Sequence, residues 1–217
     1  MTDQVFPIPG RPTAFPVKFK DMGDGSFAEV LYAVVNAFGS DPLPAGGNHI
    51  GKIGADSAVA TASFNRPADT TAYAVGDLIA NSTTAGSVVP MQITAARENA
   101  GTGSITRCRL SCNKAGMAGT ETFRVHLFKN APSAANGDNG AFNINGLAAV
   151  HLGFFEVTLD QVFSDGAKGF AAPYIGSQII FDAAAGSQLL YALIESRSAW
   201  TPGSGNTFTV ALEVLRD

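Results

Sequence analysis

Short runs of alternating apolar and polar residues, separated by polar turns, recur along this chain from residue 59 to the C-terminus. A period of two places successive side chains on opposite faces, which is typical of a strand with one buried face. We predict strands over residues 59–64, 77–80, 88–96, 104–112, 123–129, 154–159, 178–182, 188–196 and 207–215. No long amphipathic helical pattern accompanies these runs, and residues 130–143 are too polar and glycine-rich for regular structure.

This pattern predicts an all-β protein, built as an antiparallel β-sandwich or barrel. The number of strands and the lengths of the loops between them fit a jelly roll better than an immunoglobulin-like sandwich. Residues 207–215 alternate most strictly, and we expect Leu212 to be a packed core residue.

The first 16 residues contain four prolines, with Phe6, Ile8 and Phe15 among them. Proline at this density excludes helix and interior strand and favours an extended N-terminal arm. Two interpretations of the arm remain open. It docks through these three apolar side chains on another subunit, or it is a disordered terminus.

A β-hairpin is predicted to follow the arm. Residues 17–20 alternate, Asp24-Gly25 supplies the positive φ that a tight turn needs, and residues 27–36 are apolar on both faces. A helix is the competing interpretation of residues 27–36. The glycine- and proline-rich segment 39–48 divides the chain into an arm and hairpin, residues 1–48, and a sandwich domain, residues 49–217.

Charge and hydropathy exclude several classes of partner. Charged residues make up 15% of the 217 residues, against roughly 25% in an average soluble domain. So few charges indicate a loop-rich chain or a surface buried against partners. The net charge of −4 argues against a nucleic-acid-binding surface. No apolar run is long enough for a membrane-spanning helix, and the start lacks a signal-peptide pattern, so we expect synthesis in the cytoplasm.

Cysteine and histidine spacing predicts no chemical site. Cys108 and Cys112 lie about 13 Å apart along one predicted strand, too far for a disulfide, and share a face with Leu110. We predict two buried free thiols. His126 and His151 lack the paired spacing of a zinc site, and so does the third histidine.

Known catalytic and cofactor motifs are also missing from the sequence. Residues 21–25 resemble a calcium loop only superficially, because glycines occupy two ligand positions. Nucleophile elbows, phosphate loops and dinucleotide fingerprints do not occur. We therefore expect no enzyme activity, no cofactor and no bound metal.

Three features predict contacts with a partner. If residues 104–112 and 123–129 form neighbouring strands, four of their side chains gather on one outward face: Arg107, Arg109, Arg124 and His126. We predict that this face contacts an acidic surface of a partner. Residues 188–196 are apolar on both faces, and only one face can look into a sandwich. The second face must meet another sheet, the arm or a neighbouring subunit, and we assign the face of Leu190 and Ile194 to a subunit contact. Trp200 lies on a predicted loop. Three interpretations of it remain open: it stacks on a sugar, contacts a neighbouring subunit or covers the end of the core.

Four stretches resemble small β-sandwich proteins of tailed bacteriophage particles: KFKDMGDGS (18–26), PLPAGGNHIGKIG (42–54), RPADTTAYAVGDLIA (66–80) and QLLYALIESRSAWTPGSGNTF (188–208). They cover about a quarter of the chain. Such proteins commonly decorate or cement capsids, or build collars and fibres. The resemblance implies a non-enzymatic virion structural protein, made in the host cytoplasm.

The resemblance further implies a capsid decoration or cement protein. Such a protein forms a homo-oligomer and contacts the major capsid protein or other virion proteins, without binding nucleic acid or membrane. The alternative is a carbohydrate- or receptor-binding module of a phage fibre or baseplate. A third possibility, a barrel enzyme of the cupin kind, is disfavoured because clustered histidine and glutamate ligands are missing.

Overall fold

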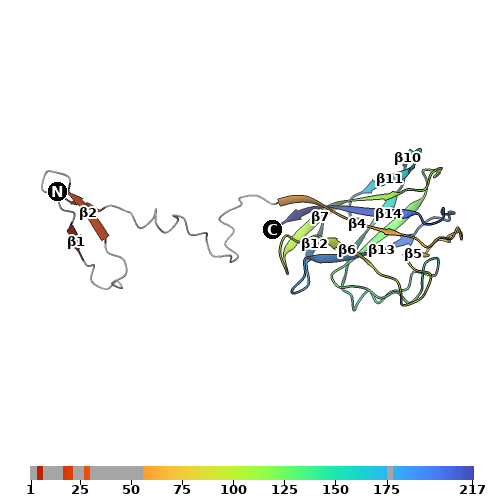
Figure 1. Cartoon of the computed structure of the whole chain (residues 1–217), viewed down its shortest axis with the longest axis horizontal. Coiled ribbons are helices and arrows are strands. Elements are labelled where there is room, and N and C mark those ends of the chain that lie inside the picture. Colours follow the sequence, from red (N-terminus) through yellow and green to blue (C-terminus); the bar gives the residue numbers. More distant parts are fainter. Residues whose placement is uncertain (1–3, 7–16, 22–26, 30–55, 175–177) are drawn as a thin grey trace. The chain divides into compact units, whose positions relative to one another are not determined.

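The structure, a computed structural model, describes residues 56–174 and 178–217 in full, and the backbone of three strands among the first 55 residues (Figure 1). The chain divides into two compact units, Met1–Ile53 and Gly54–Asp217. The predicted boundary after Asn48 lies outside the described residues and stays a prediction. Among the described residues, no helix is long and apolar enough to cross a membrane.

The N-terminal unit contains a small antiparallel sheet in the order β1-β2-β3, formed by Gln4–Phe6, Val17–Asp21 and Phe27–Glu29. The predicted hairpin is confirmed, because β2 and β3 pair antiparallel. Part of the predicted arm is itself a strand: β1 pairs with β2 of the same chain. Its position at the sheet edge suits a proline-rich segment, since proline cannot donate to a ladder. Ile8 and Phe15 lie outside the described residues.

The second unit is an antiparallel β-sandwich, which confirms the predicted fold class (Figure 1). The first sheet has the order β10-β11-β7-β14-β4, with β12 also pairing with β7. Its strands are β4 (Asp56–Asn65), β7 (Thr102–Cys112), β10 (Gln161–Phe163), β11 (Gly166–Ala171), β12 (Ile179–Asp182) and β14 (Thr207–Arg216).

The second sheet has the order β5-β13-β8-β9, and β6 also pairs with β13. Its strands are β5 (Leu78–Ile79), β6 (Met91–Thr94), β8 (Thr122–Phe128), β9 (His151–Thr158) and β13 (Leu189–Ser196). The predicted strands are all present. The hairpin β10–β11 was not predicted from the sequence, because the glycine-rich residues 166–171 show no clear alternation of apolar and polar residues.

The main core lies between the two sheets and follows the predicted alternation closely. In β14, Phe208, Val210, Leu212 and Val214 are buried, and the residues between them are more exposed. In β7, Cys108 and Cys112 are buried free thiols on the core face, as predicted. Burial raises the pKa of the Cys112 thiol to about 11.

A β-bulge in β7 overturns part of its predicted face assignment. Glu213 pairs with Arg107, but the next residue, Val214, pairs with Ile105, so Thr106 is left over. A bulge places two consecutive residues opposite one partner residue and so reverses the alternation. Ile105 is therefore buried in the core, and Thr106 is exposed. Strict alternation along residues 104–112 would instead place Ile105 outward with Arg107, and Thr106 inward with Cys108.

A second, smaller core covers the outer face of β13. Leu193 and Tyr191 pack there with residues of the β8–β9 connection, residues 129–150, which contributes Ala134, Phe142, Ile144 and Ala149. The opposite face of β13, with Leu190 and Ile194, is buried in the main core. The predicted subunit contact at Leu190 and Ile194 is therefore wrong. The second face does need a cover, but a connection of the same chain provides it.

Candidate functional site

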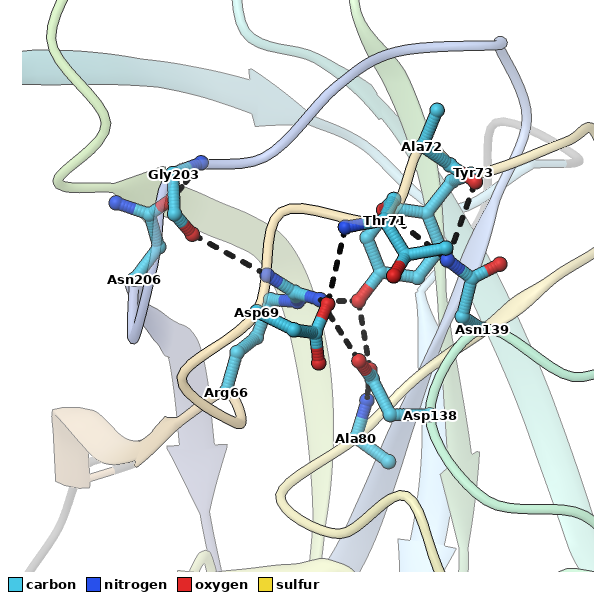
Figure 2. Close-up of polar contacts among 10 residues, drawn as sticks. All are labelled: Arg66, Asp69, Thr71, Ala72, Tyr73, Ala80, Asp138, Asn139, Gly203 and Asn206. Carbon is cyan, nitrogen blue, oxygen red and sulfur yellow. Dashed lines mark hydrogen bonds and ion pairs between the residues drawn. The ribbon is translucent and has the colours of Figure 1, made fainter.

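A buried polar network joins the loops at one end of the sandwich (Figure 2). Arg66 directly follows β4, Tyr73 lies further along the same β4–β5 connection, and Asp138 lies in the β8–β9 connection. The side chains of Arg66 and Asp138 are both 0% exposed, and Arg66 Nη2 lies 2.8 Å from Asp138 Oδ2.

The Asp138 carboxylate is fully satisfied by donors. Besides Arg66, the Tyr73 hydroxyl donates to Oδ1 at 2.6 Å, and the Ala80 backbone N–H donates to the same oxygen at 2.7 Å. Burial and the adjacent Asp138 carboxylate raise the pKa of Tyr73 far above its usual range, so the phenol keeps its proton. A buried charge is tolerated only with such partners. The network thus fixes the relative positions of the β4–β5, β5–β6 and β8–β9 connections.

Trp200 closes the same end of the core. Its ring stacks on Tyr73 at 5.3 Å and 9°, and it meets Phe123 and Phe208 edge to face. Only 7% of Trp200 is exposed. Of the three interpretations, covering the end of the core is correct, and the predicted subunit contact at Trp200 is wrong.

The outer face of the first sheet is a polar platform. Lys168, Ser111, Thr209 and Ser63 stand side by side on β11, β7, β14 and β4. The hydroxyl groups of Ser63 and Thr209 lie 2.8 Å apart and hydrogen-bond. The hydroxyl groups of Ser111, Thr209 and Ser63 make this row of the face able to form hydrogen bonds.

Arg107 and Arg109 lie on this platform, exposed as predicted. Both contact Glu213 of β14: Arg109 Nε donates to Glu213 Oε1 at 2.9 Å, and Arg107 Nε lies 3.6 Å from Oε2. One glutamate of the same sheet therefore partly neutralises the two arginines.

A shallow groove of about 510 Å³ borders the platform at the tip of the β10–β11 hairpin. Its walls include Phe163, Asp165, Lys168, Asn113 and Thr207. Phe163 is 49% exposed, and the Lys168 ammonium lies 5.0 Å from its ring centroid. The groove thus combines an exposed aromatic ring with charged, amide and hydroxyl groups.

Arg124 and His126 do not join Arg107 and Arg109, which corrects the predicted four-residue basic face. Their strands, β8 and β7, belong to different sheets. The outward sides of two packed sheets point away from each other, so the two pairs lie on opposite faces of the sandwich. Arg124 instead contacts Glu156 at 3.1 Å and Glu195 at 3.6 Å.

His126 and His151 face each other on the outer side of the second sheet. His126 Nδ1 lies 3.2 Å from His151 Nε2, and His126 Nε2 lies 3.0 Å from Glu195 Oε2. Phe142 stacks on the His126 ring with centroids 4.5 Å apart. Burial lowers the pKa of His126 to about 4, and burial also lowers the pKa of His151.

Sequence reasoning missed this histidine pair. A bulge between Leu127 and Phe128 pairs Phe128 with His151, while Leu127 pairs with Gly153. His151 is thereby turned to the outer face beside His126, and Leu152 packs toward the main core. Spacing in the sequence does not reveal such a bulge; the only local signal is the glycine at position 153.

No group of three or more histidine, cysteine, aspartate or glutamate side chains suited to a metal ion occurs within the part of the chain that the structure describes. No family model, curated protein or solved structure matches this chain.

Proposed function

We propose that this protein is a non-enzymatic structural component of a tailed-phage particle, a capsid decoration or cement protein that forms homo-oligomers. The observation that carries the proposal is the division of the chain into a compact sandwich and a separate N-terminal unit with its own small sheet. A decoration protein needs a stable body and a second element for docking on a neighbour. The resemblance of residues 18–26 and 188–208 to phage virion proteins supports the same role.

The strand order supports a jelly roll as the finer architecture. The first and last strands of the sandwich, β4 and β14, are neighbours, and β14 lies next to β7 in the same sheet. In the other sheet β13 lies between β5 and β8, and β9 follows β8. Strands distant in sequence thus lie side by side in both sheets, as in the two Greek keys of a jelly roll, an architecture common in viral capsid domains.

Exposed apolar side chains at one edge of the first sheet support a contact with other virion proteins. Val162 and Phe163 of β10, Phe170 of β11 and Ile180 of β12 are all exposed, Ile180 by 72%. The edge strand β10 also presents unpaired backbone groups. Exposed apolar groups along an unpaired sheet edge favour contact with a partner. We propose that this edge meets a neighbouring subunit or the capsid surface.

Two measurements test the virion role. Particles purified from phage whose genome encodes this chain should contain it in stoichiometric amounts by mass spectrometry, and the major capsid gene should lie nearby. Particles lacking the chain should regain stability to heat or low salt when the purified protein is added. Absence of the chain from purified particles would refute the proposal.

The groove at the β10–β11 tip favours a second candidate, a carbohydrate-binding module of a fibre or baseplate. Exposed aromatic rings beside hydroxyl, amide and charged groups suit a sugar, which offers an apolar face and a rim of hydroxyl groups. A glycan array probed with the full chain tests this candidate. A hit should weaken in Phe163→Ala, which lines the groove, and persist in Phe170→Ala, which is exposed but does not line it.

A further inference from the structure

The groove at the tip of the β10–β11 hairpin contains three polar side chains that have no partner among the described residues. The Lys168 ammonium, the Asp165 carboxylate and the Ser111 hydroxyl all line it. Within residues 56–174 and 178–217, these three groups form no hydrogen bond and no ion pair. Lys168 instead lies beside two rings, 5.0 Å from the Phe163 centroid and 6.0 Å from the Phe170 centroid. The three polar groups are therefore available to a ligand.

The register of the hairpin brings these groups together. Phe163 pairs with Gly166, and Lys168 pairs with Ser111. Directly opposed residues of an antiparallel ladder lie on the same face, and so do residues two positions apart in one strand. Phe163, Lys168 and Ser111 therefore share the outer face of the sheet. Asp165 belongs to the two-residue turn between β10 and β11.

Other polar side chains of the platform, by contrast, are paired within the sheet. Its two arginines both contact Glu213. Thr209 and Ser63 hydrogen-bond with each other at 2.8 Å. The charges of Lys168 and Asp165 are not used in this way, so the groove is where this face keeps free hydrogen-bonding capacity.

The free groups specify the chemistry of a ligand. An ammonium group offers three donors and no acceptor, so Lys168 suits an anionic group. An ionised carboxylate only accepts, so Asp165 suits hydroxyl donors. The exposed ring of Phe163 suits the apolar face of another ring. A sugar that carries a carboxylate offers all three features: an anion, several hydroxyl groups and a ring with an apolar face.

Asp165 also limits the charge of the ligand. A densely charged polyanion would bring further negative groups close to this carboxylate, and like charges repel. One carboxylate on a sugar ring avoids this repulsion, because it can face Lys168 while hydroxyl groups face Asp165. The groove volume of about 510 Å³ falls within the roughly 300–1,000 Å³ of small-molecule sites.

We propose that this groove binds an acidic saccharide, with the sugar carboxylate on Lys168, the ring on Phe163 and hydroxyl groups on Asp165 and Ser111. The proposal rests on the carbohydrate-binding role proposed for the groove, and it names the class of ligand. The ion pair is open to water, since Lys168 is exposed. Added salt therefore screens it, and the affinity for acidic glycans falls as the ionic strength rises.

A glycan array with sialylated, uronate-containing and neutral glycans, probed with the full chain, tests the proposal. We expect the bound glycans to be acidic. The strongest acidic glycan is then titrated by calorimetry beside its methyl ester, which lacks only the charge. The acid should bind about tenfold more tightly than the ester, as expected of a hydrogen bond to a charged group. This preference should disappear in Lys168→Gln, which changes an exposed side chain and should keep the thermal midpoint of the parent.

The matched control is Lys129→Gln, which removes the same charge far from the groove. Lys129 contacts Asp182, which pairs with Thr102 at the opposite end of β7 from the groove. This variant should keep the preference for the acid over the ester.

Equal affinity for the acid and the ester would overturn the proposal, and so would an unchanged preference in Lys168→Gln. Binding of neutral glycans alone would also overturn it, while the carbohydrate-binding role of the groove would stand. If the chain binds no glycan at all, both the acidic ligand and the carbohydrate-binding candidate are refuted, and the structural role in the particle is unaffected.

Discussion

The Arg66 guanidinium donates to the Asp138 carboxylate at 2.8 Å, across 72 residues of sequence, where neither side chain reaches solvent. This pair holds the end of β4 against the β8–β9 connection. Together with Tyr73 and Trp200 it closes one end of the sandwich core. The contact is therefore a fixed point for the loops rather than a reactive site.

Asp138→Asn is expected to lower the free energy of unfolding by about 3 kcal/mol, because it leaves the buried Arg66 charge with only its longer contact to Asp69, at 3.3 Å. The new amide would also place an N–H₂ group where both oxygens now accept. Urea denaturation followed by tryptophan fluorescence measures the change. Glu213→Gln is the control, since it removes a carboxylate from the exposed pair with Arg109 and should cost less than about 1 kcal/mol. Equal costs would contradict the assigned role of the buried pair.

Leu190→Asp is expected to prevent folding, because Leu190 is 0% exposed in the main core and a buried carboxylate there has no partner. Ile180→Asp, at a position 72% exposed on the first sheet, should stay folded. Circular dichroism and mass measurement in solution distinguish the two. A folded Leu190→Asp protein that fails to assemble would instead restore the subunit-contact interpretation.

Leu212→Ala should lower the free energy of unfolding by about 2–5 kcal/mol, because it removes a packed side chain from the core.

The Glu121 carboxylate accepts hydrogen bonds from the backbone N–H groups of Ala118, Gly119 and Thr120 at 2.8–3.2 Å. Burial alone would raise its pKa, but these bonds outweigh burial and lower it below 4.5. A lowered folded-state pKa contributes stability that is present above the unfolded pKa and is lost as the pH falls through the folded value.

Glu121→Gln should therefore destabilise the protein at pH 7, by about 1–3 kcal/mol. The difference from the parent should shrink as the pH falls below about 4.5. Urea denaturation at a series of pH values measures it. A difference that stays constant down to pH 3 would show that the charge of Glu121 plays no part.

Gly169 of β11 lies where the two sheets approach closely. A Cβ atom at this position would lie 1.9 Å from the Thr158 carbonyl oxygen at the end of β9. Gly169→Ala should therefore cost about 1–3 kcal/mol in unfolding free energy, as overpacking does. Gly146→Ala is the matched control, because nothing lies closer than 3.8 Å to its Cβ. Its effect should stay within about 1 kcal/mol. Equal thermal midpoints for the two variants would exclude a tight contact at Gly169.

Deletion of residues 1–48 should leave the sandwich folded, since both hydrophobic clusters of the described residues lie within the second unit. The truncated protein should bind particles more weakly if the N-terminal unit docks on a neighbour. Thermal unfolding checks the first expectation, and co-sedimentation with particles lacking the protein checks the second. Undiminished sedimentation of the truncated chain would show that the sandwich alone carries the contact.

The alternation of the sequence is sufficient to predict most strands of the sandwich and most of its core. Phe208, Val210 and Leu212 repeat with period two, and this period reports the buried face wherever one strand face packs on another sheet. The two cysteines of β7 follow the same rule, and their burial as free thiols was predictable. Turn residues similarly placed the hairpin β2–β3.

Sequence alone determined most of the strands of this protein, all but the hairpin β10–β11 in the sandwich, and that they form an antiparallel sandwich, because alternation and turn chemistry are local. Only the tertiary structure decided what each face meets. One bulge turned Ile105 into the core, another brought His151 to His126, and the β8–β9 connection covered the outer face of β13. The position of a bulge depends on which distant strands pair, and the cover of a sheet face depends on where a loop packs. These long-range contacts leave no periodic signal along the chain.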